Sequence, residues 1–434
     1  MTFTIRLFRS DRACLALVLP VAALLFAIAL GGHDLWAPDE PRSGVIVREI
    51  LETGSWAVLH ENGRPYVEKP PLYYWLAALA SRPAGAVSEL SLRLPSSLAA
   101  LAGVVLVFVL GRDLFGRRTG ALAALVIATV QGYAIEARWA HPDMLWSVCL
   151  LAACTAFWKA HRPGGDRRAL VFFHGVMGLA VLAKGPLGIL LPILAIVAYL
   201  AASRDLASLR HAGLAWGLPF ALLPAALWLL AWGVAAGEAF PLATALERIG
   251  VRFTEGVHHA RPFLHIVTSL PLEFLPWTLL LPGAILHTLP RRGARGDRAI
   301  VYLYAWIIVL VAIFGLSAEK RAVYLLPLLP FLAILVARLW DTSLMGWDPS
   351  PVGRGVAAAF STGLVLTVAA GGVVLARRPR EAPALVVPAI VLAGAAAATT
   401  LTALLVQSRA GAGAGLAAFT AGAVVCLLVV FLAV

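Results

Sequence analysis

Charged residues are scarce in this 434-residue chain: they make up 13% of it, whereas 61% of the residues are apolar. A soluble domain carries about 25% charged residues, so this composition excludes an ordinary soluble protein. Apolar runs of roughly 20 residues, the length that crosses a bilayer, recur along the whole chain. Runs such as 178–200 and 214–231 are apolar on every face, which is typical of helices embedded in lipid.

Cysteines are also few, and all of them lie within apolar runs. They are Cys14, Cys149, Cys154 and Cys426. None has the spacing or the flanking histidine of a zinc or redox motif. We therefore interpret them as small buried apolar residues.

Hydrophobicity predicts an all-α polytopic membrane protein with about thirteen transmembrane helices. The predicted spans lie near residues 13–31, 95–110, 119–135, 144–159, 169–183, 187–202, 213–232, 264–288, 299–315, 322–339, 355–375, 384–406 and 413–433. Residues 1–30 have the charges and apolar run of a signal peptide, with a weak cleavage site at 27–29. The apolar run 14–30 exceeds the usual length of about 7–15 residues, which favours a retained anchor helix.

The net charge of +12 is distributed unevenly across the predicted membrane. With a cytoplasmic N-terminus, the inner segments carry 19 basic and 7 acidic residues, and the outer segments carry 16 of each. The whole excess thus lies on one side, as the positive-inside rule requires. The basic residues orient the protein, and we predict no nucleic-acid partner.

The predicted organisation is a membrane-embedded core, residues 1–340, followed by transmembrane helices in 355–434. This second part is rich in alanine, valine and glycine, and we expect scaffold helices there and no soluble C-terminal domain. Two outward loops, 31–94 and 233–261, are too long to be turns.

The first outward loop has the pattern of a folded cap over the membrane. Asp39 can cap a helix that contains Pro41 in its first turn and ends at Gly54. The apolar face of this surface helix consists of Val45, Ile46, Ile50 and Leu51. Residues 56–67 then predict a short hairpin around Asn62-Gly63, and 72–80 predict a second interfacial helix.

Acidic and basic residues gather in this first loop. Asp39 and Glu40 follow the first span; they either cap a helix in solvent or perform acid–base chemistry. Glu68 and Lys69 precede a stiff double proline, at Pro70-Pro71, where backbone freedom is low. Lys69 can pair with Glu68, or it can neutralise a phosphate as a point charge.

Further polar residues lie at other outer helix ends. Asp143 is either a functional acid at membrane depth or an N-cap. Lys184, in Lys184-Gly185-Pro186, either reaches lipid headgroups or binds a phosphorylated ligand. In the second loop, His258 and His259 form a pair that can bind metal or serve structure. The remaining outer polar residues are Arg252, Arg261, Glu319, Lys320, Arg321 and Tyr324.

These acids and cations share one face of the predicted protein. Chemistry with a phosphate leaving group needs a carboxylate that acts as a base or positions a reactant, together with cations that stabilise the departing charge.

The motifs in this region resemble the bacterial dolichyl-phosphate-mannose–protein mannosyltransferase-like family, and most closely its lipid A aminoarabinose transferase branch. The resemblance is carried by residues 37–42 (Ala-Pro-Asp-Glu-Pro-Arg), 54–56 (Gly-Ser-Trp) and 66–75 (Tyr-Val-Glu-Lys-Pro-Pro-Leu-Tyr-Tyr-Trp). Further matches, in order, extend it over residues 36–335: they are 93–96, 142–143, 184–186, Arg252-Phe253, His259, 275–277, Lys320 and Tyr324.

The resemblance implies a C-type glycosyltransferase fold and an inverting transfer from an undecaprenyl-phosphate type of sugar donor. It implies catalytic roles for Asp39 and Asp143, with Glu40 beside them. The implied donor-phosphate residues are Arg42, Lys69, Lys184, Lys320 and Tyr324, and the implied substrate pocket contains Tyr66, Arg252 and Arg261.

A divalent metal, zinc or magnesium, is implied at Glu68 and His259, with His258 as the alternative ligand, because the Arg252–His259 spacing is a residue short. Ser43 also replaces the aromatic residue that often follows the arginine. No nucleotide is expected.

The expected partners are a polyprenyl-phosphate sugar donor, membrane lipids, and a lipid, glycan or protein acceptor. Because we expect no outward C-terminal domain like that of some relatives, the acceptor need not be lipid A. We expect a monomer in the bacterial inner membrane, with its active site facing the periplasm. The alternative function is a polytopic transporter or lipid flippase. Transporters commonly contain paired repeats with ionisable groups near the midplane, whereas this sequence shows no convincing repeat and places these groups at outer helix ends.

Overall fold

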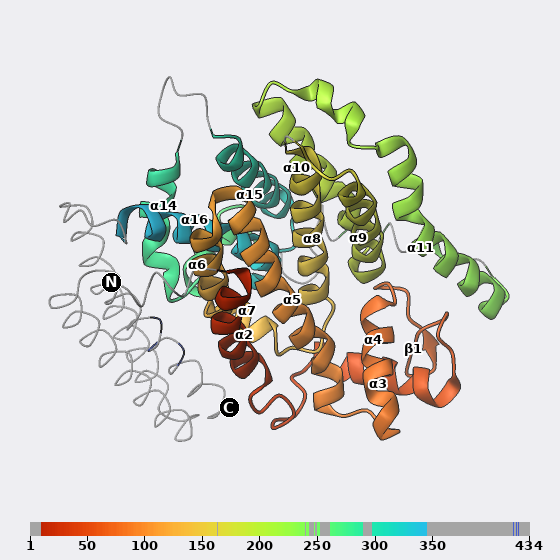
Figure 1. The fold of residues 1–434 in the computed structure, drawn as a ribbon. Helices are drawn as coiled ribbons and strands as arrows, with labels where there is room; N and C mark the ends of the chain where they lie inside the picture. Colours follow the sequence, from red (N-terminus) through yellow and green to blue (C-terminus); the bar gives the residue numbers. More distant parts are fainter. Residues whose placement is uncertain are drawn as a thin grey trace.

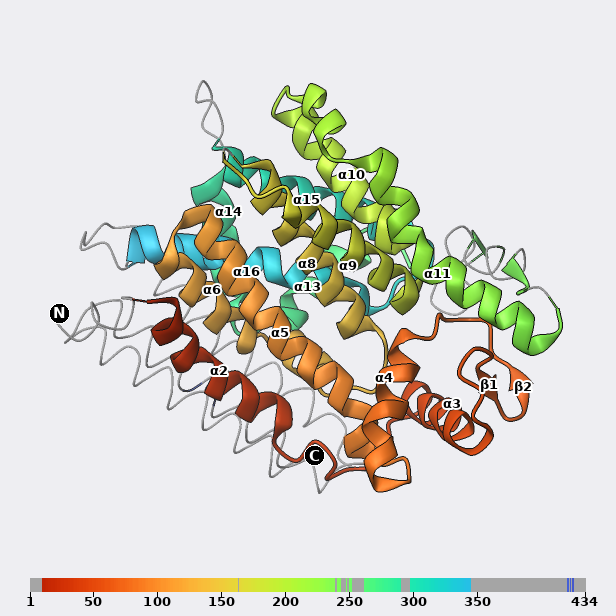
Figure 2. The same cartoon turned by 45° about the vertical axis from the view of Figure 1, so that its right-hand side comes forward.

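The protein is a bundle of long helices with a small folded segment at one end (Figure 1). The computed structural model describes residues 10–162, 164–238, 240–242, 247, 250–251, 261–289, 297–344, 420, 422 and 424. Helix α8 packs against both α5 and α9, and α9 packs in turn against α11. Helix α2 runs beside α5 and α6 (Figure 2). The long helices are α2 (Asp11–Ala27), α5 (Glu89–Phe115), α6 (Arg117–Ala128), α8 (Asp143–His161), α9 (Arg168–Lys184), α10 (Leu187–Ala202), α11 (Leu214–Ala236), α15 (Arg298–Leu316) and α16 (Leu329–Leu339).

Short helical segments connect the long ones. They are α7 (Gln131–Glu136), α13 (His265–Glu273), α14 (Leu281–Thr288), η1 (Arg82–Ala84), η2 (Leu206–His211), η3 (Trp277–Leu280), η4 (Ala322–Leu328) and η5 (Trp340–Leu344).

Five helical stretches in the described part are long and apolar enough to cross a membrane. They are Glu89–Phe115, Asp143–His161, Leu214–Ala236, Arg298–Leu316 and Ala322–Thr342. Each coincides with a predicted span, so the helical membrane architecture is confirmed. The count of about thirteen stays a prediction, because the spans expected after residue 355 lie almost entirely outside the described residues.

Two predicted spans are wrong in their detail. Residues 119–135 do not form one helix, because the chain leaves α6 at Thr129 and Val130 before α7 begins. Residues 264–288 do not form a single helix, but the succession α13, η3 and α14. Pro271 lies within α13, and Pro276 precedes η3. Proline lacks a backbone N–H and its ring clashes with the preceding helical turn, so closely spaced prolines divide an apolar segment that has the length of a span.

Close approach between helices depends on small residues, as in other membrane proteins. At the contact of α5 with α6, a Cβ atom added to Gly120 would lie 2.5 Å from the carbonyl oxygen of Phe108. A larger residue at this position would push the two helices apart.

The segment between α2 and α5 is a folded unit, which we call the cap. It contains α3 (Asp39–Thr53), the hairpin strands β1 (His60–Glu61) and β2 (Arg64–Pro65), and α4 (Leu72–Ser81). These elements lie together at one end of the bundle in both views (Figures 1 and 2). The predicted helix, hairpin and second helix are therefore confirmed.

Local sequence accounts for these elements. Gly54 ends α3 with a φ of 69°, which costs glycine little. Asn62 and Gly63 both have positive φ and turn the antiparallel hairpin. The buried face of α3 consists of Ser43, Ile46, Val47 and Ile50, together with Glu40. Of the predicted face, Ile46 and Ile50 are therefore buried, whereas Val45 and Leu51 are only partly buried.

A buried ion pair attaches the cap to the bundle. The Glu40 side chain, 2% exposed, accepts hydrogen bonds from Arg93 Nε at 2.9 Å and Arg93 Nη2 at 2.7 Å. The guanidinium of Arg93, on α5, also donates to the carbonyl oxygens of Leu30, His33 and Asp34. Arg93 thus bonds both the start of α3 and the chain that leads into it.

Replacing Arg93 by methionine should destabilise the protein strongly, because it leaves the Glu40 carboxylate buried without its cation. We expect the free energy of unfolding to fall by about 3–5 kcal/mol, measured by chemical denaturation in detergent. Arg48→Met is the matched control, since it breaks the exposed Arg48–Glu52 pair and should change stability by only about 0–1 kcal/mol. Equal effects of the two substitutions would contradict this assignment.

Candidate active site

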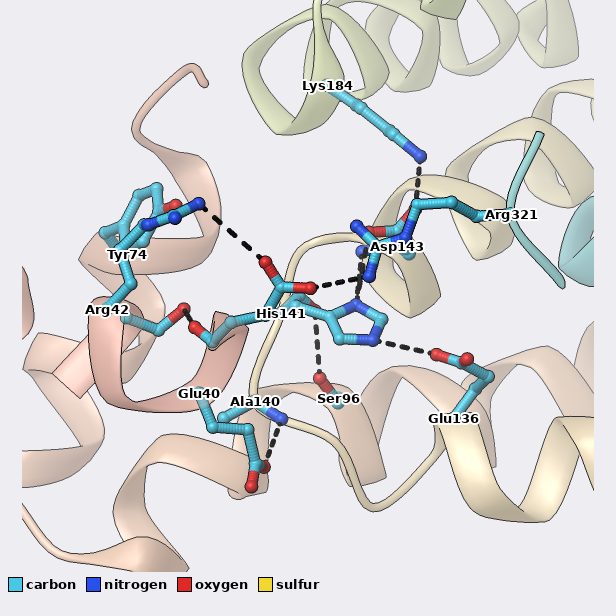
Figure 3. A network of polar contacts seen from close by, with 12 residues as sticks. Glu40, Arg42, Tyr74, Ser96, Glu136, Ala140, His141, Asp143, Lys184 and Arg321 are labelled. Atoms are coloured by element: carbon cyan, nitrogen blue, oxygen red, sulfur yellow. Dashed lines mark hydrogen bonds and ion pairs between the residues drawn. The ribbon is translucent and has the colours of Figure 1, made fainter. Parts of the chain in front are cut away.

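Polar side chains from four parts of the chain converge where the cap meets the bundle (Figure 3). Asp39 is the first residue of α3, and Asp143 is the first residue of α8. Lys184 is the last residue of α9, and Arg321 immediately precedes η4. The predicted residues Asp39, Asp143 and Lys184 are therefore brought close together by the fold.

Asp39 does not cap α3. The N-cap residue is Pro38, and no side chain caps the helix. The Asp39 carboxylate instead accepts a hydrogen bond of 2.6 Å from Arg321 Nη2 and lies 3.8 Å from Arg42 Nη1. Burial favours the protonated acid, but the Arg321 hydrogen bond and the charge of Lys69 outweigh it and lower the pKa of Asp39. Asp39 is thus an ionised, half-buried carboxylate at neutral pH.

Asp143 also has ionic partners rather than a capping role. The N-cap residue of α8 is Pro142, and no side chain caps this helix either. The carboxylate accepts a hydrogen bond from Lys184 Nζ and lies 3.1 Å from His141 Nδ1. Lys184 therefore does not extend to lipid headgroups; its ammonium lies over the rings of Trp146 and Tyr324.

His141 lies between two carboxylates and was not predicted as a site residue. Its Nε2 is 2.9 Å from Glu136, and its Nδ1 faces Asp143. Burial disfavours the imidazolium, but the charges of Glu136 and Asp143 and their hydrogen bonds raise the pKa of His141 to about 9. His141 is therefore a cation at neutral pH that holds the start of α8.

Glu40 is placed differently from the sequence expectation of a catalytic residue. Besides Arg93, its carboxylate accepts hydrogen bonds from the backbone N–H groups of Trp36 and Ala140, each at 2.8 Å. These four bonds occupy both oxygens of a group that is buried. We therefore interpret Glu40 as the residue that fixes the position of Asp39 relative to the loop before Asp143.

A cavity of about 630 Å³ opens beside this group of charges. Its charged lining residues are Glu68, Lys69, Lys184 and Glu319, and Tyr324 lies among them. Most of the rest of the wall is apolar, contributed largely by α9, α10, α11 and α15; it includes Val181, Leu187, Leu190, Trp228, Leu229 and Phe314.

Lys69 lines this cavity as a cation that forms no ion pair with a described residue. Its ammonium makes no hydrogen bond or ion pair with any residue that the structure describes, whereas Lys184 is paired with Asp143. Burial and the neighbouring cations Lys184 and Arg321 lower the pKa of Lys69, and Asp143 and Asp39 oppose that shift. An anion in the cavity would thus meet an ammonium that is in no ion pair with a described residue.

Two predicted cations have other partners. Lys320, 3% exposed, donates hydrogen bonds to the carbonyl oxygens of Ser317 and, at 2.8 Å, Arg261. Its ammonium thus fixes the turn before η4 and is not directed to a phosphate. Arg261 is exposed and its Nη1 lies 2.9 Å from His265 Nε2.

The remaining predicted residues border the site. Arg42 Nε lies 3.2 Å from Glu61. Tyr66 is buried and accepts a hydrogen bond of 3.4 Å from the hydroxyl of Tyr74. Burial raises the pKa of Tyr66 to about 12, so its phenol is neutral.

The predicted metal site is only partly within the described residues. Glu68 lines the cavity, but Arg252, His258 and His259 lie outside the described part of the chain. Among the residues that are described, no three His, Cys, Asp or Glu side chains group as metal ligands. The described residues do not complete a metal site, and we derive no chemical step through a metal.

Arg321 is a second residue of this group to which the sequence assigned no role, although the sequence placed it among the outer polar residues. It lies between the predicted residues Lys320 and Tyr324, and the only indication of its role in the sequence was its position in the polar turn 319–321. Nothing in that turn indicates which of three consecutive charged side chains reaches Asp39, 282 positions earlier in the chain.

The family expected from the motifs agrees with the match to a family model. Residues 68–232 match the model described as dolichyl-phosphate-mannose-protein mannosyltransferase. The predicted family resemblance is confirmed. This match begins at Glu68 and covers the segment that contains Lys69, Asp143 and Lys184.

Two curated relatives are named undecaprenyl phosphate-alpha-4-amino-4-deoxy-L-arabinose arabinosyl transferase. The one from Edwardsiella ictaluri is 30% identical over 331 residues, covering 72% of this chain and 57% of the relative. The one from Pseudomonas aeruginosa PAO1 is 31% identical over 332 residues, covering 75% of this chain and 59% of the relative. The chain thus spans less than two thirds of the length of these relatives.

Solved structures show the same fold. The crystal structure of ArnT from Cupriavidus metallidurans bound to undecaprenyl phosphate has a TM-score of 0.81 at 24% identity, covering 96% of this chain and 76% of that one. The archaeal oligosaccharyltransferase AglB from Archaeoglobus fulgidus has a TM-score of 0.52 at 17% identity, covering 80% of this chain and 54% of that one. At these identities the likeness establishes the fold.

The charge on His141 should make stability depend on pH. Its pKa is about 9 in the folded protein and about 6.5 in an unfolded chain. The stabilisation is therefore complete below pH about 6.5 and lost as pH rises through about 9. We expect His141→Gln to lower the thermal midpoint in detergent at pH 6, and the difference from the unsubstituted protein to narrow by pH 9.5. A difference that is constant across this range would contradict a cationic His141.

Proposed function

We propose that this chain is a membrane glycosyltransferase that moves one sugar from a polyprenyl-phosphate donor to a lipid, glycan or protein acceptor. The observation that carries the proposal is the cavity. Its apolar wall leads to the ammonium of Lys69, which forms no ion pair with a described residue and lies beside the Asp39–Arg321 and Asp143–Lys184 pairs. A polyprenyl phosphate joins a long apolar chain to an anion, and the cavity has the corresponding two parts.

We propose that the donor phosphate binds at the charged end of the cavity. Lys69 supplies a cation that forms no ion pair with a described residue, and Lys184 and Tyr324 form the wall beside it. The lipid chain lies along the apolar side chains of α9, α10 and α11. The relatives named above act, by their names, on undecaprenyl phosphate that carries 4-amino-4-deoxy-L-arabinose, which supports an undecaprenyl type of carrier here.

Asp39 acts on the acceptor. Its ionised carboxylate accepts a hydrogen bond from the acceptor hydroxyl and directs the oxygen at the anomeric carbon. The new bond forms between acceptor oxygen and anomeric carbon while the bond from that carbon to the phosphate oxygen breaks, with inversion. Because the pKa of Asp39 is lowered, the proton passes on to the released lipid phosphate or to water. A phosphate monoester has a second pKa of about 6 and can accept it.

Cations stabilise the leaving group during this step. Negative charge develops on the bridging phosphate oxygen, and an ammonium placed beforehand in a site of low dielectric lowers the energy of that charge. We assign this role to Lys69, with Lys184 held in place by Asp143. Arg321 orients Asp39, and His141 and Glu136 orient Asp143.

Several properties remain part of the proposal. We propose a location in the bacterial inner membrane with the site facing the periplasm, based on the positive-inside distribution of charge. Glu68 with His259 or His258 is a candidate pair of ligands for zinc or magnesium, Arg252 and Arg261 remain candidates for the substrate pocket, and Lys320 shapes the turn that bears Arg321. No nucleotide takes part in this chemistry, and we expect a monomer.

Asp39→Asn should remove transfer activity while leaving the fold intact. The amide keeps the shape but loses the charge that orients the acceptor hydroxyl, and we expect the transfer rate to fall by about 10²–10⁴-fold. The measurement is release of undecaprenyl phosphate from undecaprenyl-phosphate sugars by purified protein. Glu52→Gln, on the exposed face of α3, is the matched control and should retain activity. A fully active Asp39→Asn protein would refute the assignment.

Lys69→Ala should chiefly weaken capture of the donor. Loss of one charge-assisted contact to phosphate corresponds to roughly a tenfold to hundredfold loss of affinity. Binding of undecaprenyl phosphate to the variant and to the unsubstituted protein, followed by tryptophan fluorescence, would measure this change. Unchanged affinity would exclude Lys69 as the phosphate ligand.

A further inference from the structure

Glu319 is a carboxylate on the wall of the cavity that has no role in the scheme above. The residue is 7% exposed and lines the cavity together with Lys69. Its Oε2 atom is buried without a hydrogen-bond partner. Its neighbours in sequence are directed elsewhere, because Lys320 bonds backbone carbonyls and Arg321 bonds Asp39.

This isolation distinguishes Glu319 from other buried acids in the described part of the chain. Three carboxylate oxygens there are buried without a hydrogen bond: one each in Asp113, Glu136 and Glu319. Asp113 lies 4.0 Å from Lys159, and Glu136 lies 2.9 Å from His141. Glu319 has no such cation among the described residues. A buried carboxylate without a cation is costly, so the geometry indicates a cation that the ligand brings.

The two lysines that line the cavity do not neutralise Glu319. Lys184 is paired with Asp143. Lys69 lines the same cavity as Glu319, yet neither forms an ion pair with the other or with another described residue. Among the described residues, Lys69 and Glu319 thus line the cavity as a cation and an anion that form no ion pair. The complement of this cavity is a ligand that carries both a phosphate and an ammonium group.

We propose that Glu319 binds a positively charged amino group on a phosphate-bearing lipid, and so determines specificity within the cavity. This inference rests on the proposed function, because Lys69 must hold the phosphate of the same ligand. The amino group belongs either to the sugar of the donor or to the headgroup of a membrane phospholipid such as phosphatidylethanolamine. Both sources offer the same chemistry, an ammonium that donates hydrogen bonds to a carboxylate.

The test compares binding of ligands that differ in this one charge. The first pair is undecaprenyl phosphate carrying 4-amino-4-deoxy-L-arabinose and its uncharged N-acetyl form. The second pair is phosphatidylethanolamine and N-acetyl phosphatidylethanolamine, and plain undecaprenyl phosphate is the reference. Dissociation constants are measured in detergent for the unsubstituted protein, Glu319→Gln, Glu319→Asp and Lys69→Ala, with Glu52→Gln as the matched surface control.

We expect Glu319→Gln to weaken binding of an amino-bearing ligand about tenfold or more, which is the loss expected for one charge-assisted hydrogen bond. Its affinity for the N-acetyl ligands and for undecaprenyl phosphate should stay within about twofold, which also shows that the variant is folded. Glu319→Asp should restore part of the preference. If only the affinity for the amino-sugar lipid falls, the amino group that Glu319 binds belongs to the donor. If only the affinity for phosphatidylethanolamine falls, it belongs to a phospholipid.

Two failures are distinguishable. If Glu319→Gln changes neither preference while undecaprenyl phosphate still binds in a manner that requires Lys69, the role of Glu319 is refuted and the proposed function stands. If the unsubstituted protein does not bind undecaprenyl phosphate, the proposed function fails and the role of Glu319 fails with it.

Discussion

The buried pair of Glu40 and Arg93 is the interaction on which the rest of the site depends. Arg93 joins α5 to the chain that enters the cap, and Glu40 extends the connection to the backbone of Ala140. Glu40 adjoins Asp39, and Ala140 lies three positions before Asp143. One carboxylate therefore fixes both ends of the distance that separates the two proposed site acids. A buried pair of this kind adds little net stability, but removing one partner is costly. Its contribution is therefore to hold the cap in one position on the bundle.

Local sequence signals were sufficient to predict the cap. Gly54 ends α3, Asn62 and Gly63 turn the hairpin, and the double proline before Leu72 starts α4. Each of these effects depends on neighbouring residues only, so one sequence reveals it. The interruption of the predicted span at residues 264–288 was also encoded, in Pro271 and Pro276, but apolar composition concealed it.

The pairing of charges could not be predicted in the same way. Glu319, Lys320 and Arg321 are consecutive, and the family resemblance implied that Lys320 binds the phosphate. In the structure, the ammonium of Lys320 donates hydrogen bonds to carbonyl oxygens. Arg321 bonds Asp39, and Glu319 lines the cavity. The polypeptide thus divides three adjacent charges among three tasks. Which charge receives which task depends on contacts far apart in the chain, such as Asp39 with Arg321, and these do not appear as a local pattern.

The ammonium of Lys69 has a consequence for turnover. Within the proposed reaction, the donor carries a phosphodiester with a single negative charge, and the product is a monoester with up to two. The same cation therefore attracts the spent carrier at least as strongly as the loaded one. Departure of the lipid phosphate, rather than bond cleavage, would then limit the rate of repeated cycles. Accumulated lipid phosphate would compete with the sugar-loaded donor for the cavity and so inhibit the reaction.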